Sequence, residues 1–247
     1  MLDKLLLLSG NDIPFAEAQL TVHNPTLKEI AYIGEEAFFT GYQMLCISKE
    51  LLPDEDKVNL EVLSNFDILI AILKERNAVM QKNRNCVLMI LALLFPTCAI
   101  TFDKDSIVFT ENDNNTKHIL NKNNFDQFQI LIKQMFSFGQ DEEGVQSEFN
   151  PEGELSKRIA DKLKKRHQKL AEQKNLNEQL DILGRYSSVI SVGFNLPITA
   201  MMNYTVYQLF DQIKRYELKH SYDINIQSRL AGAKDIKDPE DWMKSIH

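Results

Sequence analysis

The chain has 247 residues, of which 44% are hydrophobic and 26% are charged, so it can bury the core of one large domain or two small ones. Its formal net charge of -7 argues against a general affinity for nucleic acids or anionic membranes, because phosphate binding needs clustered positive charge. The cysteines, Cys46, Cys86 and Cys98, are odd in number and form no CxxC pair, which indicates reduced thiols and not a disulfide framework.

Two apolar runs are candidates for targeting or membrane segments. Leu5–Leu8 is followed too closely by Asn11 and Asp12 for the apolar region of a signal peptide. Val87–Phe95 is much shorter than the roughly 20 apolar residues of a membrane-spanning helix, so it predicts a buried helix or strand. We therefore expect a soluble, cytoplasmic protein with no membrane partner.

The N-terminal residues 1–26 are predicted to be mostly non-helical, because Asn11, Pro14 and Pro25 interrupt a helical period. Within them, Ala18–His23 is a candidate strand.

A capping box then predicts the first helix. Thr26 and Glu29 have the required spacing, and Gly34 weakens the helix that follows. Its apolar face would carry Ile30, Ile33 and Phe38. The aromatic and aliphatic stretch 38–52 predicts further helix.

Helical periodicity returns in residues 58–80, which predict another helix. The pattern then changes, and the β-rich runs Ala99–Phe102 and Ser106–Phe109 predict a hairpin. Lys117–Leu120 is a candidate third strand, and a helix is predicted from Asn124 through Phe138.

Charge is segregated in the next part of the chain. Residues 139–155 combine Gly, Pro and acidic residues, which predicts a mobile linker. A strongly basic helix is predicted next and includes Lys164, Lys165 and Arg166. It is either an exposed helix whose charge the linker balances or a surface for an acidic partner. Nucleic acid fits it less well, because the helix lacks aromatic residues that stack on bases.

An apolar stripe continues through residues 176–192, with Gly184 as a candidate break, and Pro197 suits the start of a short helix. Asn203 is then a candidate cap for an amphipathic helix over 204–218.

A final helix is predicted over 222–230, ending at Gly232. In the tail beyond it, Trp242 and Met243 either dock on the body of the protein or bind a partner, since aromatic residues are enriched at binding hot spots.

Together these elements predict a mainly α (α+β) fold: a helical bundle with a small β-hairpin-plus-helix insertion. The predicted parts are an N-terminal strand and helical part, the insertion, the acidic linker and a C-terminal helical part with the basic helix. They span residues 1–96, 97–138, 139–155 and 156–247, respectively.

No local sequence pattern indicates catalysis. The phosphate-binding loops GxxxxGK[ST] and GxGxxG and the nucleophile elbow GxSxG are absent. The five histidines lie far apart, and none has ligand spacing to a cysteine, so no local metal site is predicted. We expect a protein that is not an enzyme and has no cofactor, although distant residues could still assemble a site.

Three segments together resemble a group of phage proteins encoded among tail genes, the tail-assembly chaperones. They are Leu20–Ile30 followed by Gly34-Glu-Glu36, Tyr204–Asp211, and Leu230–Asp235 followed by Asp241-Trp-Met243. The acidic and basic stretch at 141–174 departs from this group's pattern. The resemblance implies that the protein binds the tape-measure protein or tail-tube subunits in the host bacterial cytoplasm before assembly, without a cofactor.

The leading hypothesis is thus a non-catalytic protein-binding factor in phage tail morphogenesis. The alternative is a structural virion component, such as a baseplate or tail-tip adaptor, and either could form a homo-oligomer. A third hypothesis is an enzyme whose site forms only in three dimensions. The candidate protein-binding residues are Trp242, Met243, Lys164, Lys165 and Arg166.

Overall fold

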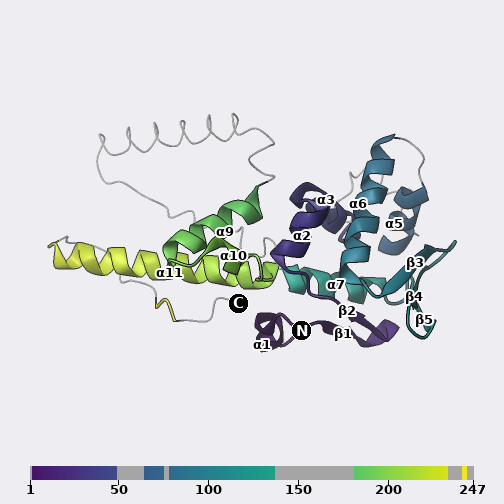
Figure 1. The fold of residues 1–247 in the computed structure, drawn as a ribbon, viewed down its shortest axis with the longest axis horizontal. Helices are drawn as coiled ribbons and strands as arrows, with labels where there is room; N and C mark the ends of the chain where they lie inside the picture. The colour runs from purple at the N-terminus through teal and green to yellow at the C-terminus, as the bar shows by residue number, and fades with distance from the viewer. Residues whose placement is uncertain (1, 49–63, 75–77, 137–180, 233–240, 244–247) are drawn as a thin grey trace.

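The computed structural model describes residues 2–48, 64–74, 78–136, 181–232 and 241–243. Within these ranges the protein is mainly helical, with two small antiparallel sheets (Figure 1). The predicted mainly α (α+β) class is therefore confirmed.

The N-terminus begins with a helix that the sequence analysis missed. The helix α1 spans Lys4–Ser9. The carboxylate of Asp3 accepts a hydrogen bond from the main-chain nitrogen of Leu5 at 2.8 Å, which caps its start. Gly10 ends it in the left-handed conformation, with φ at 71°. Local caps therefore permit a short helix in a segment whose prolines and asparagines suggested none.

The first sheet is a two-stranded hairpin. Strand β1 (Ile13–Phe15) pairs antiparallel with β2 (Leu20–Val22) across the short 3-10 helix η1 (Ala16–Ala18). The predicted strand within 18–23 is thus present. In both strands the first and third side chains are buried and the second is exposed, so this hairpin covers one side of the core.

The predicted first helix is divided in two. Helix α2 (Leu27–Ile33) begins with the predicted capping box, in which the Thr26 hydroxyl accepts from the nitrogen of Glu29 at 3.3 Å. Gly34, with φ at 87°, ends α2 and precedes α3 (Glu35–Leu45). Gly34 therefore does more than weaken one helix: its left-handed φ lets the chain turn between two.

A helical pair follows in the chain. Helices α5 (Asn65–Lys74) and α6 (Ala78–Leu94) replace the single helix predicted over 58–80, part of which lies outside the described residues. The apolar run that began at Val87 belongs to α6, which settles the choice between helix and strand. Helix α3 packs against α6 at Gly41, where a Cβ atom would lie 2.5 Å from the carbonyl oxygen of Cys86.

The predicted hairpin, third strand and helix are all present. Strands β3 (Cys98–Phe102), β4 (Ile107–Glu111) and β5 (Lys117–Leu120) form an antiparallel sheet in the order β3-β4-β5. The turn between β3 and β4 contains no glycine and is closed by a hydrogen bond from the nitrogen of Asp103 to Ser106 O at 2.9 Å. Helix α7 (Phe125–Phe136) follows.

One hydrophobic cluster joins the inserted sheet to the helices. Its aromatic centre brings Phe95, the residue after α6, within 4.3 Å, centroid to centroid, of Phe109 in β4, and within 6.0 Å of Phe128 in α7. Phe15 of β1 contacts Phe128 from another side at 5.7 Å. The strands therefore bury their apolar face in the same core as the helices, because a three-stranded sheet of this size needs a packing partner.

The C-terminal elements differ from prediction in three places. Helix α9 (Ile182–Gly193) runs through Gly184 without a break. Helix α10 (Ile198–Met201) follows Pro197 as predicted. The next helix is capped by Thr205, which forms a capping box with Gln208, and not by Asn203.

The third difference is that the helices predicted over 204–218 and 222–230 are one helix, α11 (Val206–Leu230). No Gly or Pro interrupts its interior, so nothing in the sequence breaks the hydrogen-bond ladder. Gly232, with φ at 87°, lies just beyond the C-cap Ala231, close to the predicted end. In Figure 1, α11 runs along the long axis, and its C-terminal half extends past α9 and α10.

The loop before α11 is bonded to the start of α2. The nitrogens of Leu27 and Lys28 donate to Tyr204 O at 2.8 Å and Met202 O at 2.9 Å. These bonds give partners to two of the N–H groups that a helix start leaves unpaired. No helix in the described ranges is both long enough and apolar enough to cross a membrane.

Candidate functional site

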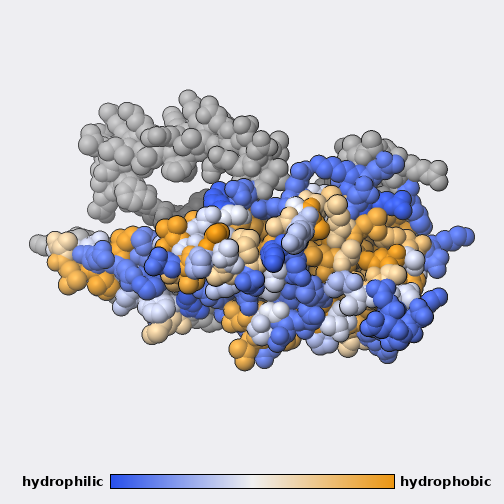
Figure 2. All heavy atoms as spheres, viewed as in Figure 1, coloured by the Kyte–Doolittle hydropathy of each residue, from blue (hydrophilic) through white to orange (hydrophobic). Residues whose placement is uncertain are grey.

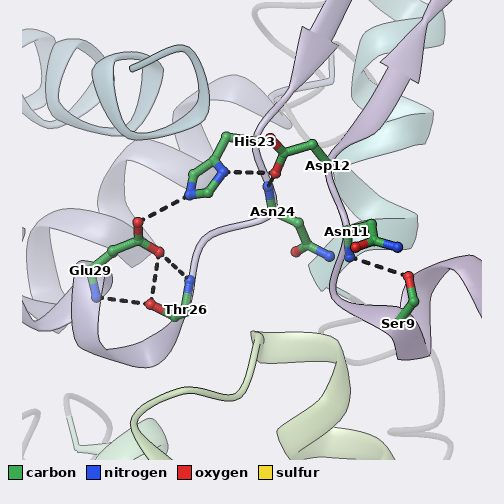
Figure 3. A network of polar contacts seen from close by, with 7 residues as sticks. All are labelled: Ser9, Asn11, Asp12, His23, Asn24, Thr26 and Glu29. Atoms are coloured by element: carbon green, nitrogen blue, oxygen red, sulfur yellow. Dashed lines mark hydrogen bonds and ion pairs between the residues drawn. The ribbon is translucent and has the colours of Figure 1, made fainter. Parts of the chain in front are cut away.

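The densest polar cluster lies where β2 leads into α2 (Figure 3). The imidazole of His23 is held between two carboxylates, with Nδ1 at 2.7 Å from Asp12 Oδ1 and Nε2 at 3.1 Å from Glu29 Oε1. The other oxygen of Glu29 accepts from both the nitrogen and the hydroxyl of Thr26 at 2.7 Å. Asp12 also accepts from the nitrogen of Asn24 at 3.1 Å.

These contacts assign the cluster a structural role. Burial tends to raise the pKa of Glu29, but the hydrogen bonds from Thr26 and the contact with His23 outweigh it, so the pKa of Glu29 is lowered. A catalytic histidine would need a nucleophile within hydrogen-bond reach. The Thr26 hydroxyl is directed at Glu29 instead. The cluster fixes the elbow between β2 and α2.

The sequence analysis missed this cluster because its members are far apart along the chain. Asp12 and His23 are brought together by the β1–β2 hairpin, and only the pair Thr26 and Glu29 had a local signature. Asn24 beside them is buried, and neither atom of its side-chain amide has a hydrogen-bond partner among the residues that the structure describes.

Other chemistry is sparse in the described residues. Burial raises the pKa of the Cys46 thiol to about 11, and it also raises the pKa of Cys86 and Cys98, so all three thiols stay protonated near neutral pH. Within the described ranges, no three His, Cys, Asp or Glu side chains are grouped so that they could hold a metal ion.

A shallow hollow of about 320 Å³ lies between β1, η1 and α7. Among the described residues that line it, Glu17 alone is ionisable. A binding pocket for a small molecule is usually enclosed and presents several convergent polar groups. This hollow is open, and the oxygen of one of its polar side chains, Gln134, already accepts a hydrogen bond from the nitrogen of Leu2.

Of the predicted binding residues, Trp242 and Met243 are described. The carbonyl oxygen of Trp242 accepts a hydrogen bond from Arg215 Nη1 of α11 at 2.6 Å, and its side chain is half-buried. The side chain of Met243 is 71% exposed. Lys164, Lys165 and Arg166 lie outside the described residues, as does the predicted linker 139–155.

An exposed apolar surface lies at the end of α9 and the start of α10, and we call it the α9–α10 surface. It consists of Val189, Val192, Phe194, Leu196 and Ile198, whose exposed fractions range from 39% to 83%. In Figure 2, the surface over this part of the protein is mixed, with hydrophobic residues beside residues of intermediate and polar character. No Asp, Glu, Lys, Arg or His occurs from Tyr186 to Phe210.

The loop that carries this surface is folded tightly onto α9. The nitrogen of Leu196 donates to Ser191 O at 2.9 Å, and the Ser191 hydroxyl donates back to Leu196 O at 2.6 Å. Phe194 packs edge to face on Tyr216 of α11, with ring centroids 5.6 Å apart. The apolar side chains are therefore presented by a fixed backbone.

The run without charges was the sequence signal that could have located this surface. Of these residues, Val189 and Val192 were placed on the predicted apolar stripe of a helix, because periodicity cannot tell which apolar residues find a partner. In the structure, α11 covers only the inner face of α9, where Leu183, Ser187 and Ile190 are buried.

Part of the chain matches a known protein family. Residues 173–247 match the family described as the YomV second domain, and this range contains α9, α10 and α11. The family is phage-derived, which suggests a phage protein. No curated protein and no solved structure matches the chain significantly.

Proposed function

We propose that this protein is a non-catalytic protein-binding factor of phage tail morphogenesis, which holds the tape-measure or tail-tube protein in the host cytoplasm before assembly. The observation that carries the proposal is the α9–α10 surface, an exposed apolar area inside the region that matches a phage-derived family. The resemblance of three sequence segments to tail-assembly chaperones supports the same function.

The composition of this surface suits a protein partner. The largest exposed apolar patch on a typical monomeric protein is often a binding site. Charged residues are depleted at the centre of protein–protein interfaces, and aromatic residues are enriched there. The stretch that carries the α9–α10 surface lacks charged residues, and the surface includes the aromatic Phe194. A nucleic-acid site would need cations that this stretch lacks.

The experiment is co-expression of the tagged protein with each gene of its phage's tail cluster, followed by affinity purification and mass spectrometry. We expect one tail protein, the tape-measure or the tail-tube subunit, to be recovered in stoichiometric amount. Recovery of the tagged protein alone in every combination would contradict the proposal.

The protein content of purified virions distinguishes the holding factor from the structural virion component. A holding factor leaves before the tail is complete, so quantitative mass spectrometry of virions should find it absent or far below one copy per particle. A fixed copy number per virion would instead establish the structural alternative, a baseplate or tail-tip adaptor.

A further inference from the structure

We propose that the free edge of β3 binds the same edge of a second copy of this chain. The two β3 strands pair antiparallel about Ile100 and join their three-stranded sheets into one continuous sheet. Such a dimer is independent of which tail protein the α9–α10 surface binds.

The main chain of β3 directs hydrogen-bonding groups away from its own sheet. In Figure 1, β3 lies at one side of the sheet and β5 at the other, so only one edge of β3 pairs with β4. The nitrogen of Asp103 donates to Ser106 O at 2.9 Å, which makes these two a hydrogen-bonded pair. Such pairs alternate along an antiparallel ladder, so the N–H and C=O groups of Ile100 and Phe102 point to the free edge. Among the described residues, none forms a hydrogen bond to these groups there.

The other strands carry features that obstruct pairing at a free edge. Strands β1 and β2 are only three residues long, and β1 contains Pro14, which has no N–H. On β5, Lys117 adds an exposed charge, and Ile119 O already accepts from Asn124 Nδ2 at 2.9 Å. The five residues of β3, Cys98–Phe102, include no charge and no proline, and their register with β4 has no bulge. Because proteins usually obstruct an exposed edge, the unobstructed edge of β3 indicates a strand partner.

The sequence of β3 suits pairing with itself. A two-fold axis at Ile100 places this residue opposite its copy, as a pair that exchanges both N–H···O bonds. Cys98 then lies opposite Phe102 on the half-buried face of the strand. Ala99 lies opposite Thr101 on the exposed face. No charge faces a like charge in this arrangement, because the charged turns that follow β3 lie at opposite ends of the paired strands.

We expect the dimer to be weak and reversible. An edge five residues long offers less than the about 800 Å² per partner that a standard interface buries. Main-chain hydrogen bonds still fix the register, as they do when an extended segment adds to a sheet edge. The fraction of dimer should therefore rise with protein concentration.

Ile100→Pro tests the edge, and Ile100→Ala is its matched control. Proline removes the outward N–H and with it both bonds of the central pair, whereas alanine removes the side chain and keeps the N–H. Sedimentation velocity of the full-length protein over a range of concentrations should show that the wild type and Ile100→Ala dimerise. Dimerisation of Ile100→Pro should be at least about tenfold weaker than that of Ile100→Ala, and circular dichroism checks that both variants are folded.

Cysteine pairing tests the register, and it gives a result even if Ile100→Pro does not fold. A tagged Ala99→Cys protein is mixed with an untagged Thr101→Cys protein under mild oxidation. In a non-hydrogen-bonded pair the two Cα atoms lie about 4.5 Å apart, which a disulfide can span. Mass spectrometry should find more disulfide between positions 99 and 101 of the two variants than within either variant alone, where the engineered positions are offset along the strands.

Three results would overturn the proposal. The first is a wild type that stays monomeric at every concentration. The second is an Ile100→Pro protein that folds and dimerises as strongly as Ile100→Ala, because the dimer would then use another surface. The third is cross-linking that does not favour the mixed pair, because the two strands would then not meet about Ile100.

Discussion

At the β2–α2 elbow, the carboxylate of Glu29 closes the helix cap and also contacts an imidazole. One of its oxygens receives two bonds from Thr26, and the other lies 3.1 Å from His23. Hydrogen bonds to an ionised carboxylate favour its charged form. The pKa of Glu29 is accordingly lowered, which makes its contribution to stability dependent on pH.

We expect Glu29→Gln to lower the free energy of unfolding at pH 7 by a few tenths of a kcal/mol to about 1 kcal/mol, because the amide keeps the cap but loses the charge. A lowered folded-state pKa contributes stability above the unfolded pKa of about 4.5 and loses it as the pH falls through the folded pKa. The difference from wild type should therefore shrink below about pH 4.5 in urea titrations. The exposed Glu217→Gln serves as control, and a constant difference at all pH values would contradict the prediction.

Asn24 is the second residue whose environment leads to a prediction, because its side-chain amide is buried. Within the described part of the chain, its side-chain atoms lack hydrogen-bond partners, while its main-chain nitrogen donates a hydrogen bond to Asp12. Replacing an unpaired buried polar group by an apolar group of similar shape can be neutral or stabilising. We expect Asn24→Leu to leave the melting temperature unchanged or raise it, and Asn24→Asp to lower it, because the latter buries a charge. A marked loss of stability in Asn24→Leu would show that the amide has a required partner.

At the scale of the elements, the close packing of α3 against α6 depends on Gly41, which has no side chain. A Cβ on Gly41 would lie 2.5 Å from Cys86 O and 2.9 Å from Ile90 Cγ2. Because the first neighbour is a helix backbone, it cannot turn aside, and the two helices would have to separate.

Gly41→Ala should therefore destabilise the protein by about 1–3 kcal/mol, even though alanine is the better helix former. Gln43→Ala, at an exposed position of the same helix, should change stability little. Chemical denaturation of both variants measures the contrast. A stabilised Gly41→Ala would mean that helix propensity outweighs the close packing.

The long helix α11 has two unequal halves. Its fully buried residues all lie between Val206 and Ile213, and Leu209 is completely buried, whereas Ile224 is 50% exposed. The first half therefore belongs to the core, and the second half adds little to it.

We expect Leu209→Ala to lower the free energy of unfolding by about 2–5 kcal/mol. Ile224→Ala on the same helix should change it by less than about 1 kcal/mol. Thermal unfolding followed by circular dichroism compares the two. Similar losses in both variants would show that the second half is as tightly packed as the first.

At the scale of the whole molecule, long-range polar contacts join α9–α11 to the N-terminal elements. Glu35, the first residue of α3, accepts a hydrogen bond from the nitrogen of Leu183 in the first turn of α9 at 2.9 Å. Burial raises the pKa of Glu35, and the main-chain bonds of α9 offset this only in part. Asp181, the N-cap residue of α9, makes no capping bond, so Glu35 acts as a cap from another helix.

Two further contacts have the same role. Gln208 Nε2 donates to Leu8 O at 2.8 Å, and Lys4 lies 3.4 Å from the carboxylate of Asp211. Because these contacts connect residues about 200 positions apart, they hold the α9–α10 surface in a fixed place on the molecule.

Glu35→Ala should cost about 1 kcal/mol, as the loss of a helix cap does, and should speed amide hydrogen exchange in the first turn of α9. Glu36→Ala, which removes the neighbouring exposed carboxylate and its contact with Lys82, should leave exchange in α9 unchanged. Exchange measured by mass spectrometry resolves this segment. Equal exchange in both variants would mean that apolar packing alone fixes α9.

The sequence predicted those elements whose signals are local. The capping box at Thr26 and Glu29, the hairpin after Pro96 and the apolar period of α7 depend on neighbours a few residues away, and all are present. The incorrect predictions concern the boundaries of the C-terminal helix, where more than one residue can serve as a cap or an end. Asn203 was predicted as the cap and two helices were predicted over 204–218 and 222–230, but Thr205 caps α11, which continues without interruption to Leu230.

The candidate surface was not predicted, and the reason is physical. Sequence alone determined that Val189, Val192, Phe194, Leu196 and Ile198 are apolar and that no charge lies among them. Whether an apolar side chain is buried depends on which other element covers it, and that information is spread along the whole chain. The mainly helical class and most element types were therefore determined by the sequence itself. The tertiary structure alone decided that α11 covers one face of α9 and leaves this surface exposed, because packing is a relation between distant segments.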